Sequence, residues 1–208
     1  MNSLAPVIFV VDDDPSVRIA LERLIKSVGF RVQTFDTAQT FFNHAPCDAP
    51  CCLILDVRMP QMSGLEIQEE MTLRGLYMPI IFITGHGTVS MSVRAMKAGA
   101  MDFLEKPFEE QQLLDAIQAA VEKDRQSKQN QLEILQIQKN AASLTPREYE
   151  VFKLVVSGRL NKQIAYKLAV SEKTIKVHRG RVMNKMQAKS LASLVRMAEK
   201  IGIFRASD

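Results

Sequence analysis

A short apolar run that ends on a single acid is the feature that most limits what this chain can fold into. The run is Cys52-Leu53-Ile54-Leu55-Asp56, and the segment Val57-Arg58-Met59-Pro60 follows it as a turn. An apolar run of this length, closed by a turn, predicts a buried β-strand. A charged group is costly beside a buried strand unless it has a partner, so Asp56 is predicted to have a chemical role.

Further strands and helices alternate along the first half of the chain. Four more strands are predicted at 7–11, 31–35, 79–83 and 102–104. Helices are predicted after Pro15, around 41–42, after Gly64 and up to about Ala98. This alternation predicts an α/β doubly wound fold, with a five-stranded parallel sheet and helices on both faces.

Polar side chains follow the predicted strands. They are Asp12, Asp13, Asp56, Thr84 and Lys106. The carboxyl ends of parallel strands lie on one edge of a sheet, so these groups should converge there. Clustered carboxylates repel one another unless a cation lies among them, and Mg²⁺ prefers such oxygen ligands. One carboxylate can then attack phosphorus while a hydroxyl and an ammonium hold the transferred oxygens.

The first half resembles the receiver domain of two-component response regulators. The matching segments are Val11–Asp13, Leu55–Pro60, Met62–Gly64, Thr84–Gly87, Ala95–Ala100 and Lys106–Phe108. The resemblance implies a flavodoxin-like receiver over residues 1–124. It also implies that Asp56 accepts a phosphoryl group from a phosphohistidine on a sensor histidine kinase.

The same resemblance assigns roles to individual residues. It implies that Mg²⁺ is held by Asp13, Asp56, the backbone carbonyl of Arg58 and, mostly through water, Asp12. It implies that Thr84 and Lys106 contact the phosphoryl group, that Phe103 is the aromatic switch, and that His86 lies beside the site without being a ligand. Beyond the Mg²⁺-dependent phosphorylation and dephosphorylation of its own aspartate, no enzymatic activity is expected.

A second phosphoryl chemistry fits part of the same pattern. Asp12-Asp13-Asp14 contains the Asp-x-Asp pattern that haloacid-dehalogenase-type phosphatases carry after their first strand. Asp12 would then be the nucleophile and Asp14 the acid/base. This alternative is weaker because no second acidic pair follows a later strand, there is no cap insertion, and Asp56 would have no role.

The two parts of the chain carry opposite charge. Residues 1–143 hold 13 Lys and Arg against 18 Asp and Glu, a balance of −5. Residues 144–208 hold 14 against 5, a balance of +9, within a net charge of +4 for the whole chain. A basic region of this size is typical of polyanion binding.

Cysteine usage and hydropathy indicate the cellular setting. Cys47, Cys51 and Cys52 are an odd number in one short segment, with no second Cys or His cluster, so they are interpreted as reduced thiols. No apolar run approaches the roughly 18 residues of a membrane span, and the N-terminus has no secretory features. A cytoplasmic protein with no membrane contact is expected.

Residues 125–142 are predicted to form a helical linker. The helical pattern begins near Phe108, and the segment 123–138 is rich in Gln, Lys and Glu. Polar residues at Asp124, Lys128 and Gln131 interrupt the apolar seam that a coiled coil would need. We therefore expect an extended, partly exposed helix whose length sets the spacing of the two domains.

The last domain, residues 143–208, opens with a clear helix start. Thr145 is the predicted N-cap, Pro146 the first helical residue, and Glu148 completes a capping box. A second helix is predicted at 161–168, and a third follows a tight turn at 169–171. Two short helices around such a turn form a helix-turn-helix.

The third helix separates into two faces by its i, i+3 and i+4 spacing. The inward face comprises Ile175, Val182 and Met186, with part of His178. The outward face comprises Lys173, Lys176, Val177, Gly180, Arg181 and Asn184. Cations, a small apolar side chain and an amide on one face suit the major groove of DNA.

This part resembles the LuxR-type helix-turn-helix of the FixJ and NarL branch of response regulators. The matching segments are Leu144–Glu148, Asn161–Ala165 and Thr174–Arg179. The resemblance implies base contacts from Lys176 and Val177, and phosphate contacts from Lys173, Thr174, Arg179, Arg181 and Lys185. Gly180 departs from the family pattern, in which a polar side chain often stands there. The helix 190–200 resembles the dimerisation helix of these proteins, although Leu191, Leu194 and Val195 fit a core equally well.

Together these features predict a DNA-binding transcriptional response regulator. Phosphorylation of Asp56 adds roughly −1.5 to −2 charge. Thr84 and Lys106 would move to pair with the phosphoryl group, and Phe103 would turn inward. The face of the fourth helix, fifth strand and fifth helix would then form a homodimer that binds double-stranded promoter DNA, with RNA polymerase as a further partner. A phospho-dependent adaptor without DNA binding is the remaining alternative.

Overall fold

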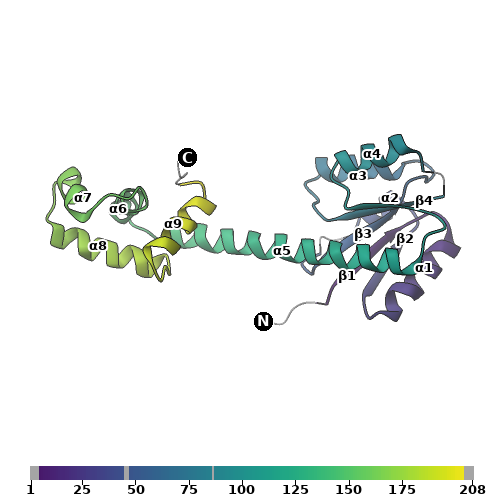
Figure 1. Ribbon diagram of the computed structural model, residues 1–208, viewed down its shortest axis with the longest axis horizontal. Helices are drawn as coiled ribbons and strands as arrows, with labels where there is room; N and C mark the ends of the chain where they lie inside the picture. The colour runs from purple at the N-terminus through teal and green to yellow at the C-terminus, as the bar shows by residue number, and fades with distance from the viewer. Residues whose placement is uncertain (1–4, 45–46, 86, 204–208) are drawn as a thin grey trace. The chain divides into compact units, whose positions relative to one another are not determined.

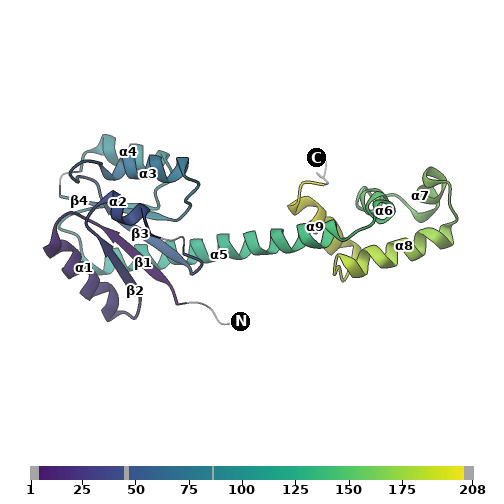
Figure 2. The ribbon, with the colours of Figure 1, turned by 180° about the vertical axis from the view of Figure 1, so that it is seen from behind.

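The computed structural model describes residues 5–44, 47–85 and 87–203. The described residues form two compact units, one within 1–128 and one within 129–208. Each unit has its own buried core, and each is shown in Figures 1 and 2. No helix in the described ranges is long and apolar enough to cross a bilayer.

The first unit is built on a five-stranded parallel sheet, as predicted. Its strands are β1 (Val7–Val11), β2 (Arg31–Phe35), β3 (Cys51–Asp56), β4 (Ile80–Thr84) and β5 (Asp102–Glu105). They are arranged in the order β2-β1-β3-β4-β5. In this register Val11 pairs with Leu55 and Asp56 with Ile83, so the carboxyl ends of the three central strands are level at one edge.

Helices cover both faces of the sheet (Figure 1). They are α1 (Pro15–Ser27), α2 (Ala38–Phe42), α3 (Gly64–Leu73), α4 (Val89–Lys97) and α5 (Glu110–Ala142). Helix α1 and the first part of α5 cover one face, and α2, α3 and α4 cover the other. Strands β1, β3 and β4 are therefore buried on both sides, which explains their continuous apolar sequences.

Helix α5 is one continuous helix that includes the predicted linker, residues 125–142. Two of the polar residues that interrupt its apolar seam, Asp124 and Lys128, have a structural role in the first unit. Asp124 is 4% exposed and accepts hydrogen bonds from the backbone N–H of Cys51 and from Lys128 Nζ, both at 2.8 Å. Lys128 also donates to the backbone carbonyls of Cys47 and Ala49, at 2.9 and 2.7 Å. These bonds attach α5 to the amino edge of β3, an anchor that the sequence pattern did not reveal.

All three cysteines lie in or next to this anchor, and all are free thiols. Burial raises the pKa of Cys51 to about 12, although Lys128 lies 3.4 Å from its Sγ. A thiol with so high a pKa is a poor nucleophile at neutral pH, so Cys51 behaves as a small core residue.

The second unit is a small helical domain. The end of α5 packs there with α6 (Pro146–Val156), α7 (Asn161–Leu168), α8 (Glu172–Lys185) and α9 (Leu191–Lys200). The predicted capping box is present: Thr145 Oγ1 accepts from the Glu148 N–H at 3.3 Å, and Glu148 Oε2 accepts from the Thr145 N–H at 2.9 Å. The turn between α7 and α8 places Ala169 in the left-handed region, with φ of 53°.

Helix α9 contributes to this core and also exposes apolar surface. Leu194 is fully buried in the core, Val195 packs partly against it, and Leu191 is 42% exposed. The sequence of this helix fits both a core role and a dimerisation role. Leu194 belongs to the core, whereas Leu191 is accessible to a partner.

Gly64, the first residue of α3, lies directly against the end of β3. A Cβ atom there would overlap the Asp56 carbonyl oxygen and stand 3.1 Å from the Phe82 ring. Gly64→Ala should therefore force the backbone apart and lower the free energy of unfolding of the first unit by about 1–3 kcal/mol. Hydrogen exchange of the β1 and β3 amides measures this quantity for that unit alone.

Gly85→Ala is the matched control for this substitution. Nothing lies within 4 Å of a Cβ at position 85. The free energy of unfolding measured at the same amides should therefore change by less than about 0.5 kcal/mol. Equal effects of the two substitutions would show that the close contact between α3 and β3 is not the cause of the loss of stability.

Candidate functional site

The residues predicted to converge do so at the carboxyl edge of the sheet. Asp12 follows β1 and is 1% exposed, Asp56 ends β3 and is 7% exposed, and Thr84 ends β4 and is 1% exposed. Lys106 Nζ lies 3.0 Å from Asp12 Oδ2 and 3.0 Å from Asp56 Oδ1. Its backbone N–H donates to the Thr84 carbonyl at 2.7 Å, which holds the segment after β5 against β4.

The position of this cluster follows from the strand order. Strand β1 has β2 on one side and β3 on the other, so the chain leaves these neighbouring strands in opposite directions. A crevice forms at such a switch point in doubly wound sheets, and ligands bind there. Asp12 and Asp56 stand on the two sides of this crevice.

The Asp56 carboxylate is held at both oxygens. Oδ1 accepts from Lys106, and Oδ2 accepts from the backbone N–H of Arg58 at 2.7 Å. Burial raises the pKa of Asp56, the Lys106 ammonium opposes this shift, and Asp12 adds to it. Burial lowers the pKa of Lys106, but hydrogen bonds to the two carboxylates outweigh it, so the net shift is upward. Lys106 therefore stays charged at neutral pH.

The remaining acids of the first loop differ in accessibility and partners. Asp13 is exposed at the same edge of the sheet. Asp14 is the N-cap of α1, and its Oδ1 accepts from the Ser16 N–H at 2.7 Å. The phosphatase alternative needs Asp14 as an acid/base, whereas here its side chain is used to cap a helix.

The oxygen ligands at this edge suit a hydrated cation. Within the described ranges, no three acidic, His or Cys side chains form a closed metal cage. Mg²⁺ needs only one or two protein carboxylates because it retains several waters. An exposed carboxylate at Asp13, the nearby Asp56 and the Arg58 backbone carbonyl are hard oxygen donors of the required kind. The residues present therefore fit Mg²⁺.

Phe103, on β5, packs close to Thr84. Its ring centroid lies 6.2 Å from that of Phe82, and the side chain is half-buried. A Cβ atom at Gly87 would stand 3.0 Å from the Phe103 ring and 3.1 Å from Thr84 Cγ2. The glycine thus allows the aromatic ring and the hydroxyl-bearing side chain to approach the same space. His86, predicted to lie beside the site, falls outside the described residues.

In the second unit, α8 has the two predicted faces. Ile175, Val182 and Met186 have no exposed surface. The opposite face is exposed along its length, at Lys173, Lys176, Val177, Gly180, Arg181 and Asn184. No atom lies within 4 Å of a Cβ built at Gly180, so the centre of this face is open.

Three of the predicted phosphate contacts have partners inside their own domain. Arg179 Nη1 donates to Asn161 Oδ1 at 3.0 Å, and Thr174 Oγ1 lies 2.8 Å from the Ser171 hydroxyl. Lys185 Nζ donates to Glu148 Oε2 at 2.6 Å and to the Ser143 carbonyl at 3.0 Å. The Lys185 ammonium and the Thr145 backbone lower the pKa of Glu148 to about 2. Lys185 therefore stabilises the capping box of α6.

Comparisons with known proteins cover both units. Residues 8–118 match the model of the response regulator receiver domain, and residues 142–198 match that of the luxR family of bacterial regulatory proteins. Nodulation protein W of Bradyrhizobium diazoefficiens is 48% identical over 97% of this chain and 88% of its own length. FixJ of the same organism, a transcriptional regulatory protein, is 42% identical over 94% and 96%.

Solved structures agree with these matches. The response regulator StyR is 49% identical, covers 94% of this chain and 99% of its own, and superposes with a TM-score of 0.84. Full-length FixJ from B. japonicum is 41% identical, covers 96% and 98%, and has a TM-score of 0.58. The chain belongs to the response regulators of the FixJ and NarL branch.

As a response regulator of this branch, it is a transcription regulator that joins a receiver domain to a LuxR-type DNA-binding domain. The residues matched by the receiver model, 8–118, include Asp12, Asp56 and Lys106. The phosphatase alternative left Asp56 without a role. The resemblance drawn from the sequence is therefore confirmed for both domains.

The raised pKa of Asp56 predicts an unusual dependence of receiver stability on pH. A carboxyl whose folded pKa exceeds its ordinary value near 3.8 loses stability as pH rises from that value through the folded pKa. Asparagine resembles the protonated acid, so Asp56→Asn should remove this loss and make the receiver more stable than wild type at pH 7. Hydrogen exchange of the β3 amides at several pH values measures the stability of the receiver in both proteins.

Asp48→Asn serves as the control for this comparison, because Asp48 is exposed and remote from the strand ends that carry the site. Its substitution should leave the difference between acid and neutral pH as in wild type. An Asp56→Asn receiver that is less stable than wild type at pH 7 would contradict the prediction.

Proposed function

We propose that Asp56 is the phosphoacceptor of this response regulator and that its phosphorylation controls DNA binding by the second unit. The proposal assigns residues 1–124 to the receiver, 125–142 to the linker and 143–208 to the DNA-binding domain. The observation that supports it most is the Lys106 ammonium, 3.0 Å from both Asp12 and Asp56 at the switch point of the sheet.

The phosphoryl donor is a phosphohistidine on a sensor histidine kinase. A carboxylate oxygen of Asp56 attacks the phosphorus atom, the phosphorus–nitrogen bond breaks, and the imidazole leaves with the bonding electron pair. Asp13, Asp56 and the Arg58 backbone carbonyl would hold Mg²⁺, with Asp12 acting mostly through water, and the bound ion would supply positive charge beside the transferred oxygens. Lys106 and Thr84 hold those oxygens by a charge-assisted and a neutral hydrogen bond.

The new charge changes what Lys106 and Thr84 bind. Phosphorylation adds roughly −1.5 to −2 charge beside a lysine that two carboxylates now share. Lys106 and Thr84 turn toward the phosphoryl oxygens, and Phe103 moves into the space beside Gly87. The surface of α4, β5 and α5 changes shape as a result, and two receivers pair through it.

The output is recognition of double-stranded promoter DNA by α8. Lys176 and Val177 read bases, while Lys173, Thr174, Arg179, Arg181 and Lys185 bind phosphates. Lys173 and Arg181 are exposed and can bind phosphates without rearrangement. Arg179 and Lys185 must instead divide their hydrogen bonds between DNA and their partners within the domain. A homodimer presents two such helices to half-sites about one helical turn apart, or a multiple of that spacing. RNA polymerase is a further partner at the promoter.

Acetyl phosphate with Mg²⁺ should add one phosphoryl group to the wild-type chain and none to Asp56→Asn. Intact-mass spectrometry before and after treatment measures this. Asp48→Asn, an exposed acid outside the site, should be modified as wild type is. Modification that persists in Asp56→Asn but is lost in Asp12→Asn would instead support the phosphatase alternative.

DNA binding should depend on the outward face of α8. Lys176→Ala should weaken binding to a selected genomic fragment by about 1–3 kcal/mol and relax its sequence preference. Arg181→Ala should weaken binding to all sequences and reduce the slope of log affinity against log salt by about 1. Fluorescence anisotropy over a salt series measures both quantities.

Arg23→Ala provides the control for charge alone, because Arg23 is an exposed cation on α1 of the receiver. It should leave both the affinity and the salt slope unchanged. If DNA retention survives the Lys176 and Arg181 substitutions together, the adaptor without a DNA role becomes the better account.

A further inference from the structure

Arg147, in the first turn of α6, is bonded to another helix of the second unit. The segment Leu144–Glu148 contains one charged side chain outside the capping box, that of Arg147. Its Nη1 donates to Glu150 Oε2 at 2.9 Å, and its Nη2 donates to the backbone carbonyl of Leu168 at 2.5 Å. Leu168 is the last residue of α7. One guanidinium group thus links the start of α6 to the end of α7.

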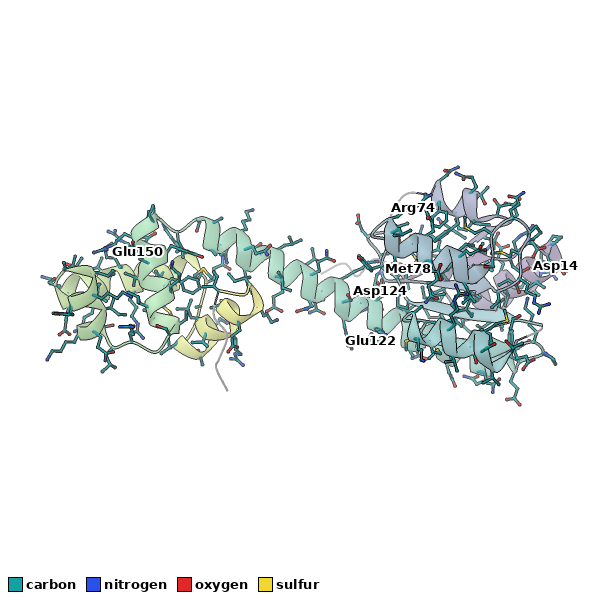
Figure 3. All side chains as sticks on the ribbon, turned by 90° about the horizontal axis from the view of Figure 1, so that it is seen from above. Asp14, Arg74, Met78, Glu122, Asp124 and Glu150 are labelled. Carbon is teal, nitrogen blue, oxygen red and sulfur yellow. The ribbon has the colours of Figure 1, made fainter. Side chains whose placement is uncertain are left out.

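The two partners of Arg147 differ in accessibility. The Glu150 side chain, labelled in Figure 3, is 52% exposed. An exposed ion pair contributes little, because water and salt screen it. The bond to Leu168 is partly buried and joins residues 21 positions apart. Charge-assisted hydrogen bonds are stronger where water is partly excluded, so the bond to Leu168 is the one that can hold two helices together.

The Leu168 carbonyl lies immediately before the turn into α8. Leu168 and Ala169 share one peptide group, and Ala169 has φ of 53°. This left-handed conformation is sparsely populated by residues with a Cβ atom, so it persists only where the surrounding structure holds it. The Ala169 N–H donates to the Tyr166 carbonyl at 3.3 Å, and Arg147 binds the carbonyl of the same peptide group. Both sides of that peptide group are therefore fixed.

The first turn of α6 also contacts the far end of α8. Glu148, next to Arg147 in sequence, accepts a hydrogen bond at 2.6 Å from Lys185, the last residue of α8. Two adjacent residues of α6 thus bind the turn that precedes α8 and the residue that ends it. Between them, Ile175 and Val182 of α8 pack in the core. Apolar packing is non-directional, whereas hydrogen bonds near both ends restrict how the helix can tilt.

We propose that Arg147 is a positioning residue for DNA recognition. By holding the turn before α8, it fixes the angle at which the outward face of α8 meets the bases, without touching DNA itself. Base readout needs hydrogen-bonding groups placed with defined geometry, whereas phosphate contacts carry no sequence information. Loss of Arg147 should therefore reduce sequence preference more than overall affinity. This positioning role rests on the proposed function of α8 in reading bases.

Arg147→Met in the full-length protein tests this role, because it keeps the length of the side chain and removes its donors. The ratio of the affinities for a selected genomic fragment and for unrelated DNA of equal length should fall about tenfold, the loss expected when a base contact is misplaced. Fluorescence anisotropy measures both affinities. In hydrogen exchange, the amides of Ala169 and Val170 should become less protected while those of α6 stay protected, because the domain remains folded.

Three further variants separate the effects of charge, of the exposed ion pair and of the carbonyl bond. Lys153→Met removes one cation from an exposed position on the same helix and should leave the affinity ratio as in wild type. Glu150→Gln removes the ion pair, keeps the bond to Leu168, and should also leave the ratio unchanged. Arg147→Lys keeps the charge but has a shorter side chain without the planar fork, so it should lower the ratio.

A lower affinity ratio in both Arg147 variants, with both controls as in wild type, supports the positioning role. An unchanged ratio in the Arg147 variants would overturn it. An equal fall in Lys153→Met would also overturn it, because charge alone would then account for the effect. If Arg147→Met does not fold, Arg147→Lys decides by itself.

Lys176→Ala separates failure of this role from failure of the proposed function. If Lys176→Ala lowers the affinity ratio and the Arg147 variants do not, only the positioning role of Arg147 is wrong. If Lys176→Ala leaves the ratio unchanged, the proposed function of α8 in reading bases is wrong, and the positioning role fails with it.

Discussion

The Lys106 ammonium, shared between Asp12 and Asp56, is the interaction on which the receiver site depends. The register of β1 with β3 brings these two buried carboxylates to the same edge of the sheet. Without a cation their repulsion would disfavour the charged state of both. Lys106 comes from the loop after β5, and its backbone bond to Thr84 ties that loop to β4. One ammonium group therefore joins the carboxyl ends of β1 and β3 to the loop after β5.

Strand β3 is held by charge-assisted hydrogen bonds at both of its ends. At the carboxyl end Asp56 is paired with Lys106, and at the amino end the Cys51 N–H donates to Asp124. Asp124 is in turn bonded to Lys128, whose ammonium also caps the carbonyls of Cys47 and Ala49. The strand that carries Asp56, the proposed phosphoacceptor, is thus attached directly to α5. A change at one end of β3 has a short covalent and hydrogen-bonded path to the helix that carries on into the linker.

The receiver fold and the rim of its sheet could be predicted from the sequence because both depend on local patterns. Buried strands give continuous apolar runs, and parallel strands put their carboxyl ends on one edge, so Asp12, Asp56, Thr84 and Lys106 could be grouped without coordinates. The anchor at Asp124 could not be found in this way. It joins residues 73 positions apart through a polar contact, and no periodicity marks such a contact. In the sequence, Asp124 and Lys128 are visible only as interruptions of an apolar seam.

The same limit applies to the basic residues of α8. A charge balance of +9 counts every cation as available to DNA. In the structure, some of these cations are hydrogen-bonded within the domain and others are exposed. Lys185 is bonded to Glu148, whose pKa of about 2 keeps it charged at any physiological pH, and Arg179 is bonded to Asn161. Lys173, Lys176 and Arg181 are exposed on the open face. Because a phosphate that binds Lys185 must compete with a buried carboxylate, Lys185 should contribute less to DNA affinity than Arg181 and more to the stability of the domain.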